Sequence, residues 1–461
     1  MTCLIESRKP ILFPAKGADF IPNCEALYEK LKAEGATAAE VAAGIALDLG
    51  SYLREWKLAG FIAEGSLNQT GIDAQIEKFL SLAKELGGEK LYNETVEEAG
   101  KITKSSIKKM CELRIEGKLN TVWGHDYATN LTHSLRRGAR WVTSNPCKIT
   151  AFKKDCPEIY AKLLKDIKNE NPGASVTDMT SLIFTKINSI SMRELRPIFE
   201  ASHGEWGFVC TQTDPRNIEP ADSTKKMIEQ IRFWDESYKK ELGVDITNAV
   251  YKLPAVENGL EAARVLAAEG YKLCMTLNFT VTQHEKFAEI FAAQKRFGFV
   301  VLMGGLLDDK VGVDLESLGI PNAKEIGRHA AQAVIRKSYR NLRAKGYDKY
   351  VSIMTAAVRG PWAIANSLAP ADGAPISITT LTNKINEFDE NPSPLCSDID
   401  TPVDPEIMNI LMQSKVFRQA YALPEDGLLS WNDLYSFPPF IAFYDQFRDA
   451  YTELENDIKA L

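Results

Sequence analysis

Short, continuous apolar runs alternate with helix-patterned segments from about residue 119 onward. The runs that predict strands are Thr121–Gly124, Ala139–Thr143, Gly207–Thr211, Asn248–Lys252, Lys272–Leu277, Gly298–Leu302, Tyr350–Met354 and Ile376–Thr380. Each is four to six residues long, and we interpret them as continuous rather than alternating, which is typical of strands covered on both faces. Segments with helical spacing lie between them, such as Cys156–Asn169, Ser223–Leu242 and His284–Lys295. Eight strands separated by helices predict an α/β fold, the (β/α)₈ or TIM barrel. The competing open, doubly wound sheet would need a glycine-rich phosphate turn after an early strand, and we find none.

Residues 1–118 predict helices only. Small and apolar residues recur at helical spacing in Thr37–Trp56, Gly71–Leu86 and Thr95–Leu119, and Gly87-Gly88 predicts a break. We recognise no catalytic motif in this region. We therefore interpret 1–118 as a helical N-terminal extension, a cap or interface domain, ahead of a barrel that spans 119–395.

The C-terminal part predicts a polar connection followed by further helices. Residues 381–402 are polar and contain proline, which favours a linker or loop. In the helical segment 396–461, one helix face carries the aromatic residues Phe440, Phe443, Tyr444, Phe447 and Tyr451. Such a face packs on the barrel wall, covers the barrel mouth as a lid, or forms a subunit contact in a homo-oligomer. The sequence leaves these three interpretations open.

Bulk composition excludes several classes of function. The chain has 461 residues and a formal net charge of −7, which argues against a nucleic-acid surface. It lacks an apolar run of about 18 residues and a signal-peptide core, so we expect a cytoplasmic protein with no membrane partner. Its eight cysteines form no Cys-x-x-Cys pair and its histidines show no zinc spacing, so we expect no metal.

Polar residues follow the predicted strands at their carboxyl ends, where such barrels place their active sites. Lys252 ends the fourth strand. A lysine amine there can attack a ketone and hold it as a Schiff base, and burial favours the neutral amine that attacks. Cleavage of a C–C bond then needs a base near the adjacent hydroxyl, and Asp126 after the first strand can reach it. The other candidates at strand ends are Thr143, Asn145, Gln212, Thr276, Asn278 and Arg359.

Four segments in a fixed order add a family resemblance. They are Trp141–Pro146, Val250–Pro254, Met275–Gln283 and Thr355–Arg359. Together they resemble the transaldolase family. The resemblance implies a class I, Schiff-base enzyme that needs no cofactor and moves a dihydroxyacetone unit between sugar phosphates. It implies Lys252 as the nucleophile and Asp126 as the acid/base. It further implies Asn145 and Thr276 as groups that orient substrate or a catalytic water, and Arg359 as a phosphate contact.

Several positions depart from that family pattern. Gln212 stands where transaldolases carry a glutamate that works through water, and an amide can position water but cannot exchange a proton with it. Glutamine here is similar to the fructose-6-phosphate aldolase branch, which releases free dihydroxyacetone, but the tyrosine of that branch matches Leu302. A second phosphate-binding arginine of the family matches Gly305, and an asparagine matches Cys274.

Three interpretations follow from these departures. The first is a transaldolase, and the second is an aldolase that releases dihydroxyacetone or acts on a non-phosphorylated or other anionic sugar. The third is a non-catalytic barrel that serves as a scaffold.

Overall fold

A computed structural model describes residues 8–52, 57–129, 131–218 and 222–461. Two compact units make up this part of the chain. One contains the residues up to Lys118 with 131–141 and Ser191–Phe208, and the other contains Leu119–Thr129, Val142–Ile190 and Val209–Leu461. The division into domains at 1–118, 119–395 and 396–461 stays a prediction, because compactness does not show that a segment folds by itself.

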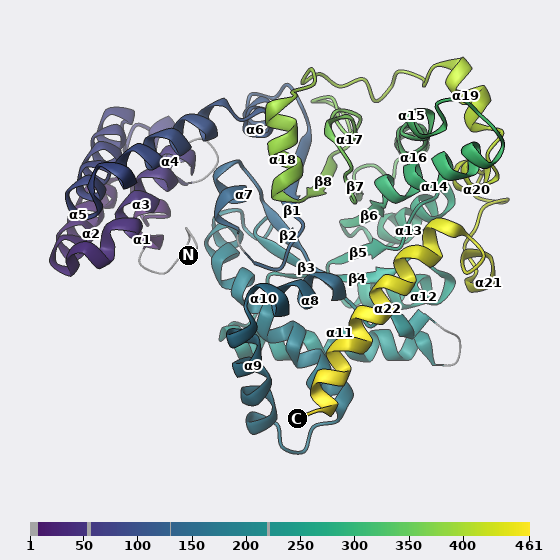
Figure 1. Ribbon diagram of the computed structural model, residues 1–461, viewed down its shortest axis with the longest axis horizontal. Coiled ribbons are helices and arrows are strands. Elements are labelled where there is room, and N and C mark those ends of the chain that lie inside the picture. The colour runs from purple at the N-terminus through teal and green to yellow at the C-terminus, as the bar shows by residue number, and fades with distance from the viewer. Residues whose placement is uncertain (1–7, 53–56, 130, 219–221) are drawn as a thin grey trace. The chain divides into compact units, whose positions relative to one another are not determined.

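Eight parallel strands close into a barrel in the order of the chain, from β1 to β8 (Figure 1). They are β1 Thr121–His125, β2 Trp141–Thr143, β3 Phe208–Gln212, β4 Ala249–Pro254, β5 Leu273–Thr276, β6 Gly298–Leu302, β7 Val351–Thr355 and β8 Ile376–Thr380. The ladder from Thr121↔Ile376 to His125↔Thr380 joins β1 to β8 and closes the ring. The predicted TIM barrel is thereby confirmed, and each predicted run agrees with its strand within two residues at either end.

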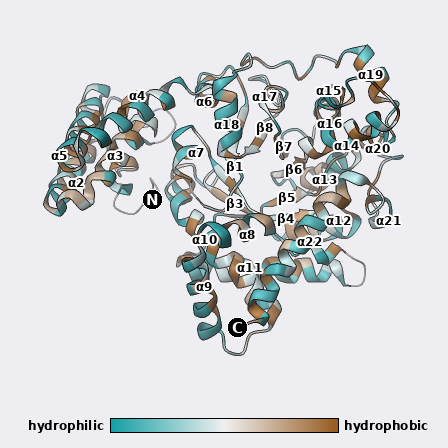
Figure 2. Ribbon diagram, in the orientation of Figure 1, coloured by the Kyte–Doolittle hydropathy of each residue, from teal (hydrophilic) through white to brown (hydrophobic). Residues whose placement is uncertain are grey.

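Helices follow the strands, as the alternating pattern predicts. They are α7 Thr132–Arg136, α8 Pro146–Asp155, α9 Pro157–Glu170, α10 Val176–Ala201, α11 Ser223–Leu242, α12 Glu257–Ala268, α13 Val281–Gln294, α14 Gly304–Ser317, α15 Ala323–Gly327, α16 Ala330–Ala344, α17 Pro361–Ala365 and α18 Thr382–Glu390. In α16 the buried residues Ala330, Val334, Ser338 and Leu342 recur every four positions, the spacing of one helix face. Hydrophilic and hydrophobic residues alternate along the helical ribbons for the same reason (Figure 2).

Helix α18 corrects the interpretation of 381–402 as a linker or loop. Ile385 and Phe388 are fully buried, and their spacing of three residues places them on one helix face. Two apolar anchors are enough to fold this mainly polar segment against its neighbours. Residues 391–404, which follow it, contain no helix or strand. The tail then forms α19 Pro405–Leu411, α20 Lys415–Tyr421, α21 Trp431–Leu434 and α22 Pro438–Lys459.

The N-terminal part of the chain is helical as predicted. Its helices are α1 Lys9–Leu12, α2 Phe20–Glu34, α3 Ala39–Tyr52, α4 Lys57–Ala63, α5 Gln69–Lys104 and α6 Ser106–Ile115. The break predicted at Gly87-Gly88 is a kink inside α5, where Gly88 adopts a φ of 82°. The helix predicted over Thr95–Leu119 is instead divided by Ser105, whose side chain caps α6. Residues 53–56, the predicted end of the helix that starts at Thr37, lie outside the described residues.

Within the described ranges, none of the helices combines the length and the apolar character needed to cross a membrane.

Candidate active site

A cavity of about 200 Å³ opens at the carboxyl ends of the strands. Six of the eight residues predicted for the site line it: Asp126, Thr143, Asn145, Lys252, Thr276 and Arg359. The other two, Gln212 and Asn278, are buried nearby but do not line the cavity. The strand pattern therefore brought together side chains that lie up to 233 positions apart in the chain (359 − 126 = 233).

Lys252 projects from β4 into the cavity and is only 5% exposed. Its Nζ donates a hydrogen bond of 3.1 Å to the carbonyl oxygen of Ser144, which follows β2. In the sheet it pairs with Gln212 on β3 and Cys274 on β5, so neighbouring strands flank it on both sides. Lys252 is therefore not a solvent-facing lysine at a strand end.

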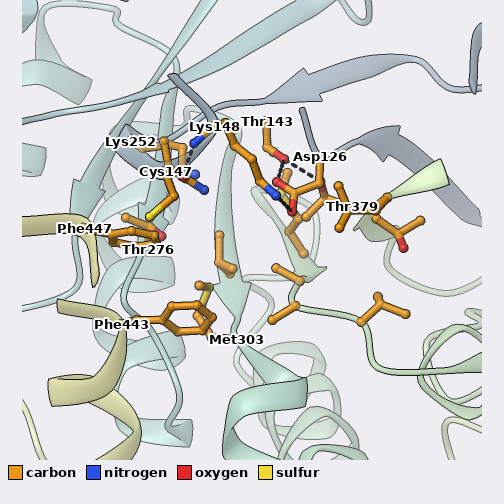
Figure 3. A pocket seen from close by; sticks show the side chains of 18 of the residues that line it. Asp126, Thr143, Cys147, Lys148, Lys252, Thr276, Met303, Thr379, Phe443 and Phe447 are labelled. Carbon is orange, nitrogen blue, oxygen red and sulfur yellow. Dashed lines mark hydrogen bonds and ion pairs between the residues drawn. The ribbon is translucent and has the colours of Figure 1, made fainter. Parts of the chain in front are cut away.

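Asp126 follows β1 directly, and its backbone N–H donates to Thr380 at the end of β8. Its Oδ1 accepts a hydrogen bond of 2.8 Å from Thr143, and its Oδ2 lies 3.3 Å from Nζ of Lys148. Figure 3 shows the two side chains approaching Asp126 from different directions. Burial opposes ionisation of this carboxyl, but the charges of Lys148 and Lys252 and the Thr143 hydrogen bond outweigh it and lower the pKa of Asp126. Asp126 is thus a carboxylate at neutral pH and can accept a proton.

Several polar atoms in and near the cavity wall are buried without a hydrogen-bond partner in the described part of the chain. They are Ser144 Oγ, Gln212 Oε1, Thr276 Oγ1, Thr380 Oγ1 and both amide atoms of Asn278. Buried polar groups in proteins are normally hydrogen-bonded, and leaving one unpaired costs about 1–3 kcal/mol. Of these, Thr276 Oγ1 and Thr380 Oγ1 belong to residues that line the cavity, so their unused hydrogen-bonding capacity is open to the hydroxyl groups of a polar ligand or to water.

Asn145 has a structural role as well as a place in the cavity wall. It is the N-cap of α8, and its Oδ1 accepts a hydrogen bond of 3.1 Å from the backbone N–H of Lys148. Its two interpretations, turn residue and ligand contact, are therefore compatible.

Arg359 lies at the rim of the cavity with 38% of its side chain exposed. Its Nε donates to Asp309 at 2.9 Å and its Nη1 to the carbonyl oxygen of Ala357 at 3.2 Å. An exposed ion pair of this kind contributes about 0–1 kcal/mol, so an anionic ligand can displace Asp309 at little cost.

Close packing explains why Gly305 carries no side chain. A Cβ built at this position would lie 1.9 Å from the carbonyl oxygen of Ala357 and 2.7 Å from Cγ of Arg359. The loop after β7 therefore occupies the space in which an arginine at 305 would begin. Ala357 itself adopts a φ of 58°, a strained conformation for a residue with a Cβ.

Several cavity residues were missed by sequence reasoning. Lys148 stands three residues after Asn145, in the first turn of α8, so helical spacing could have placed it beside the site. Phe443, Gln446 and Phe447 come from α22, which packs against α8. Phe443 stacks on Phe447 with ring centroids 5.4 Å apart. Phe443 and Phe447 thus form part of the cavity wall (Figure 3), which agrees with the interpretation of this aromatic face as a cover of the barrel mouth.

Comparisons with known proteins agree with this geometry. Residues 129–418 match the family model described as Transaldolase/Fructose-6-phosphate aldolase. A transaldolase of Mycobacterium leprae is 26% identical over 268 residues, which cover 54% of this chain and 68% of the relative. One of Thermobifida fusca is 31% identical over 160 residues, 34% of this chain and 40% of the relative. A transaldolase of Mycolicibacterium smegmatis is 25% identical over 287 residues, which cover 57% of this chain and 72% of the relative. The family match covers more than half of the chain and includes Lys252, so this aldolase-type enzyme belongs to the transaldolase/fructose-6-phosphate aldolase family.

Proposed function

We propose that this enzyme transfers a dihydroxyacetone unit between sugar phosphates through a Schiff base on Lys252. One observation carries the proposal: the buried amine of Lys252 and the ionised carboxylate of Asp126 line the same cavity. An amine and a base at one cavity are the two groups that Schiff-base cleavage of a C–C bond requires.

The first step joins the ketose to the enzyme. The neutral amine of Lys252 attacks the ketone carbon to form a carbinolamine. The hydroxyl of that carbinolamine takes up one proton and departs as water, which leaves a cationic iminium. The Ser144 carbonyl oxygen accepts a hydrogen bond from the amine and orients it. The buried hydroxyl of Thr276 lines the cavity and has no hydrogen-bond partner among the described residues, so it is available to bind the oxygen that leaves as water.

The second step breaks the C–C bond. Asp126 takes the proton of the hydroxyl on the carbon that departs, an aldehyde leaves, and the bonding electron pair moves into the iminium to form an enamine. Thr143 orients the carboxylate through its 2.8 Å hydrogen bond. The enamine then attacks the carbonyl carbon of an aldose phosphate, Asp126 returns the proton, and water hydrolyses the new iminium.

Cover over the cavity supports transfer rather than release. The enamine must survive until the acceptor arrives, and water that protonates it produces free dihydroxyacetone. Phe443 and Phe447 of α22 present an apolar surface to the cavity and limit the access of water.

Gln212 favours the second candidate, an aldolase that releases dihydroxyacetone. Gln212 pairs with Lys252 in the sheet, and its Oε1 is buried with no hydrogen-bond partner within the described ranges. An amide cannot pass a proton to or from the water that ends a transfer cycle.

Arg359 supports a phosphate on the substrate, because it is the arginine that lines the cavity among the described residues. The absence of a second arginine at Gly305 removes a charge-assisted contact that is worth roughly 1.5–3 kcal/mol. A non-phosphorylated or differently charged sugar is the alternative that this loss favours.

Borohydride trapping tests the proposal. The enzyme is incubated with fructose 6-phosphate and with a panel of other ketoses, reduced, digested and mapped by mass spectrometry. We expect a reduced adduct on Lys252 and none in Lys252→Met; exposed Lys154 is an internal control that stays unmodified. Product formed only when an aldose phosphate is added indicates transfer, and free dihydroxyacetone without it indicates the aldolase. An unmodified Lys252 with every ketose would reject both in favour of the scaffold.

A further inference from the structure

Lys148 is a second ammonium group at the cavity, and the proposed reaction assigns it no step. Its side chain is 18% exposed, and its Nζ lies 3.3 Å from Oδ2 of Asp126. Its backbone N–H is held by Oδ1 of Asn145, the cap that fixes where α8 begins. The position of Lys148 is therefore determined by the helix start and not by a flexible loop.

We propose that Lys148 is a positioning residue that keeps Asp126 ionised and oriented throughout the reaction cycle, an inference that rests on the proposed Schiff-base function. The geometry is that of a fixed ion pair: Thr143 holds Oδ1 at 2.8 Å, and Lys148 faces Oδ2. Together they hold both carboxylate oxygens of Asp126, which lines the cavity.

The need for Lys148 follows from the charge of Lys252 during turnover. Lys252 also favours ionisation of Asp126 while it is an ammonium. It must lose that charge to attack the ketone, regains it as the iminium, and loses it again as the enamine. Lys252 therefore supports the carboxylate in only some of these states. The ammonium of Lys148 takes no part in bond making and supports it in all of them.

The other groups around Asp126 do not supply this charge. His125 precedes it on β1, and burial lowers the pKa of this histidine to about 4, so it is neutral near pH 7. Thr143 on β2 and Thr379 on β8 contribute hydroxyl groups to the same cluster. Among the described residues, Lys148 is the cation within ion-pair distance of Asp126.

The test compares Lys148→Met, which removes the charge at similar length, with Lys148→Arg, which keeps it. Lys154→Met is the matched control, because Lys154 is an exposed lysine of the same helix. The first readout is the pH profile of kcat/KM for ketose cleavage. Loss of an adjacent positive charge raises the pKa of a carboxyl group by about one to three pH units. We therefore expect the acid limb of the Lys148→Met profile to shift to higher pH by about that amount. Lys148→Arg and Lys154→Met should retain the wild-type limb.

A second readout does not depend on turnover. The carboxyl carbon of Asp126 is titrated by NMR in protein with ¹³C-labelled aspartate, and the spectrum of Asp126→Asn assigns its signal. We expect Lys148→Met to titrate at higher pH than the wild type. Because this titration needs no substrate, it remains decisive even if borohydride shows no adduct on Lys252, which distinguishes failure of this inference from failure of the proposed function.

Three results would overturn the role of Lys148. One is an unchanged titration of Asp126 in Lys148→Met. Another is an increase in KM with an unmoved pH profile, which indicates substrate binding instead. The third is a Lys148→Arg variant that behaves like Lys148→Met although its melting temperature matches the wild type.

Discussion

The amine of Lys252 donates a 3.1 Å hydrogen bond to the backbone carbonyl oxygen of Ser144, so a strand-end lysine on β4 is tied to the segment that follows β2. A carbonyl oxygen has no charge to lose or gain. It therefore accepts an N–H from an ammonium, from a neutral amine or from an iminium, although the charged donors bind it more strongly. This contact lets the charge of Lys252 change during a reaction while its position is kept.

Replacement of Asp126 by Asn is expected to separate the two halves of the reaction. An amide can occupy the same site but cannot accept the hydroxyl proton, so cleavage should slow by more than tenfold while borohydride still traps an adduct on Lys252. Two quantities are measured: kcat for ketose cleavage, and the fraction of enzyme that borohydride traps as an adduct on Lys252. Exposed Asp372→Asn serves as the control and should turn over normally. Wild-type turnover in Asp126→Asn would reject its role as the base.

Replacement of Gln212 by Glu is expected to move the enzyme toward acceptor-dependent transfer. The new carboxylate stands beside Lys252 in the sheet and can exchange a proton with water, which the amide cannot do. The ratio of transfer product to free dihydroxyacetone, measured with and without an aldose phosphate, reports the change. An identical ratio in both proteins would show that position 212 does not control the outcome.

Replacement of Gly305 by Ala should destabilise the protein and lower its activity. The added Cβ would meet the Ala357 carbonyl oxygen at 1.9 Å, so the loop that carries Arg359 has to move, at a cost of about 1–3 kcal/mol. Thermal unfolding and kcat/KM measure the two effects. Gly173→Ala, where no atom lies within 4 Å of the new Cβ, is the matched control and should unfold like the wild type. For the same reason, Gly305→Arg should fail to improve phosphate binding, and a lower KM for a sugar phosphate would contradict the packing argument.

Replacement of Phe443 by Ala should increase the release of free dihydroxyacetone. Phe443 lines the cavity from α22, and its removal admits water to the enamine. We expect a higher ratio of release to transfer with little change in the trapped adduct on Lys252. Phe297→Ala is the control, since this 44% exposed residue precedes β6 and so lies at the other end of the strands. If both variants give the wild-type ratio of released dihydroxyacetone to transfer product, α22 does not exclude water from the enamine.

Stability should fall as the solution is acidified, in part because of His284. This buried histidine contacts Ser338 Oγ at 2.7 Å and the Val301 carbonyl oxygen at 3.2 Å, and burial lowers its pKa to about 4. The unfolded chain binds this proton near pH 6.5, so the free energy of unfolding decreases as pH falls from about 6.5 to about 4. The decrease is about 1.4 kcal/mol per pH unit, or about 3 kcal/mol in all.

Urea unfolding between pH 7.5 and pH 4 measures this slope. His284→Gln should be less stable than the wild type at pH 7.5, because it loses fitted contacts, but its slope should be shallower. A slope equal to that of the wild type would assign the acid sensitivity to other groups.

Local pattern predicted most of the barrel because its strands are covered on both faces. Continuous burial favours apolar residues at successive positions, as in Phe299–Leu302, and this signal marks a strand without knowledge of its neighbours. The segment 381–402 was misread for the opposite reason. Only two of the residues of α18, Ile385 and Phe388, are buried apolar anchors, and the surrounding polar composition concealed them.

What the sequence determined by itself was the barrel, the order of its strands, and the placement of Lys252 and Asp126 at strand ends, because each depends on periodicity along a single stretch of chain. Tertiary structure alone decided that Lys148 faces Asp126, that Phe443 and Phe447 wall the cavity, and that Gly305 has no room for a side chain. These contacts join segments that are distant in the chain. They arise only when the ring of strands closes and the outer helices pack against it, and no periodicity in one segment records which residue of another segment it will meet.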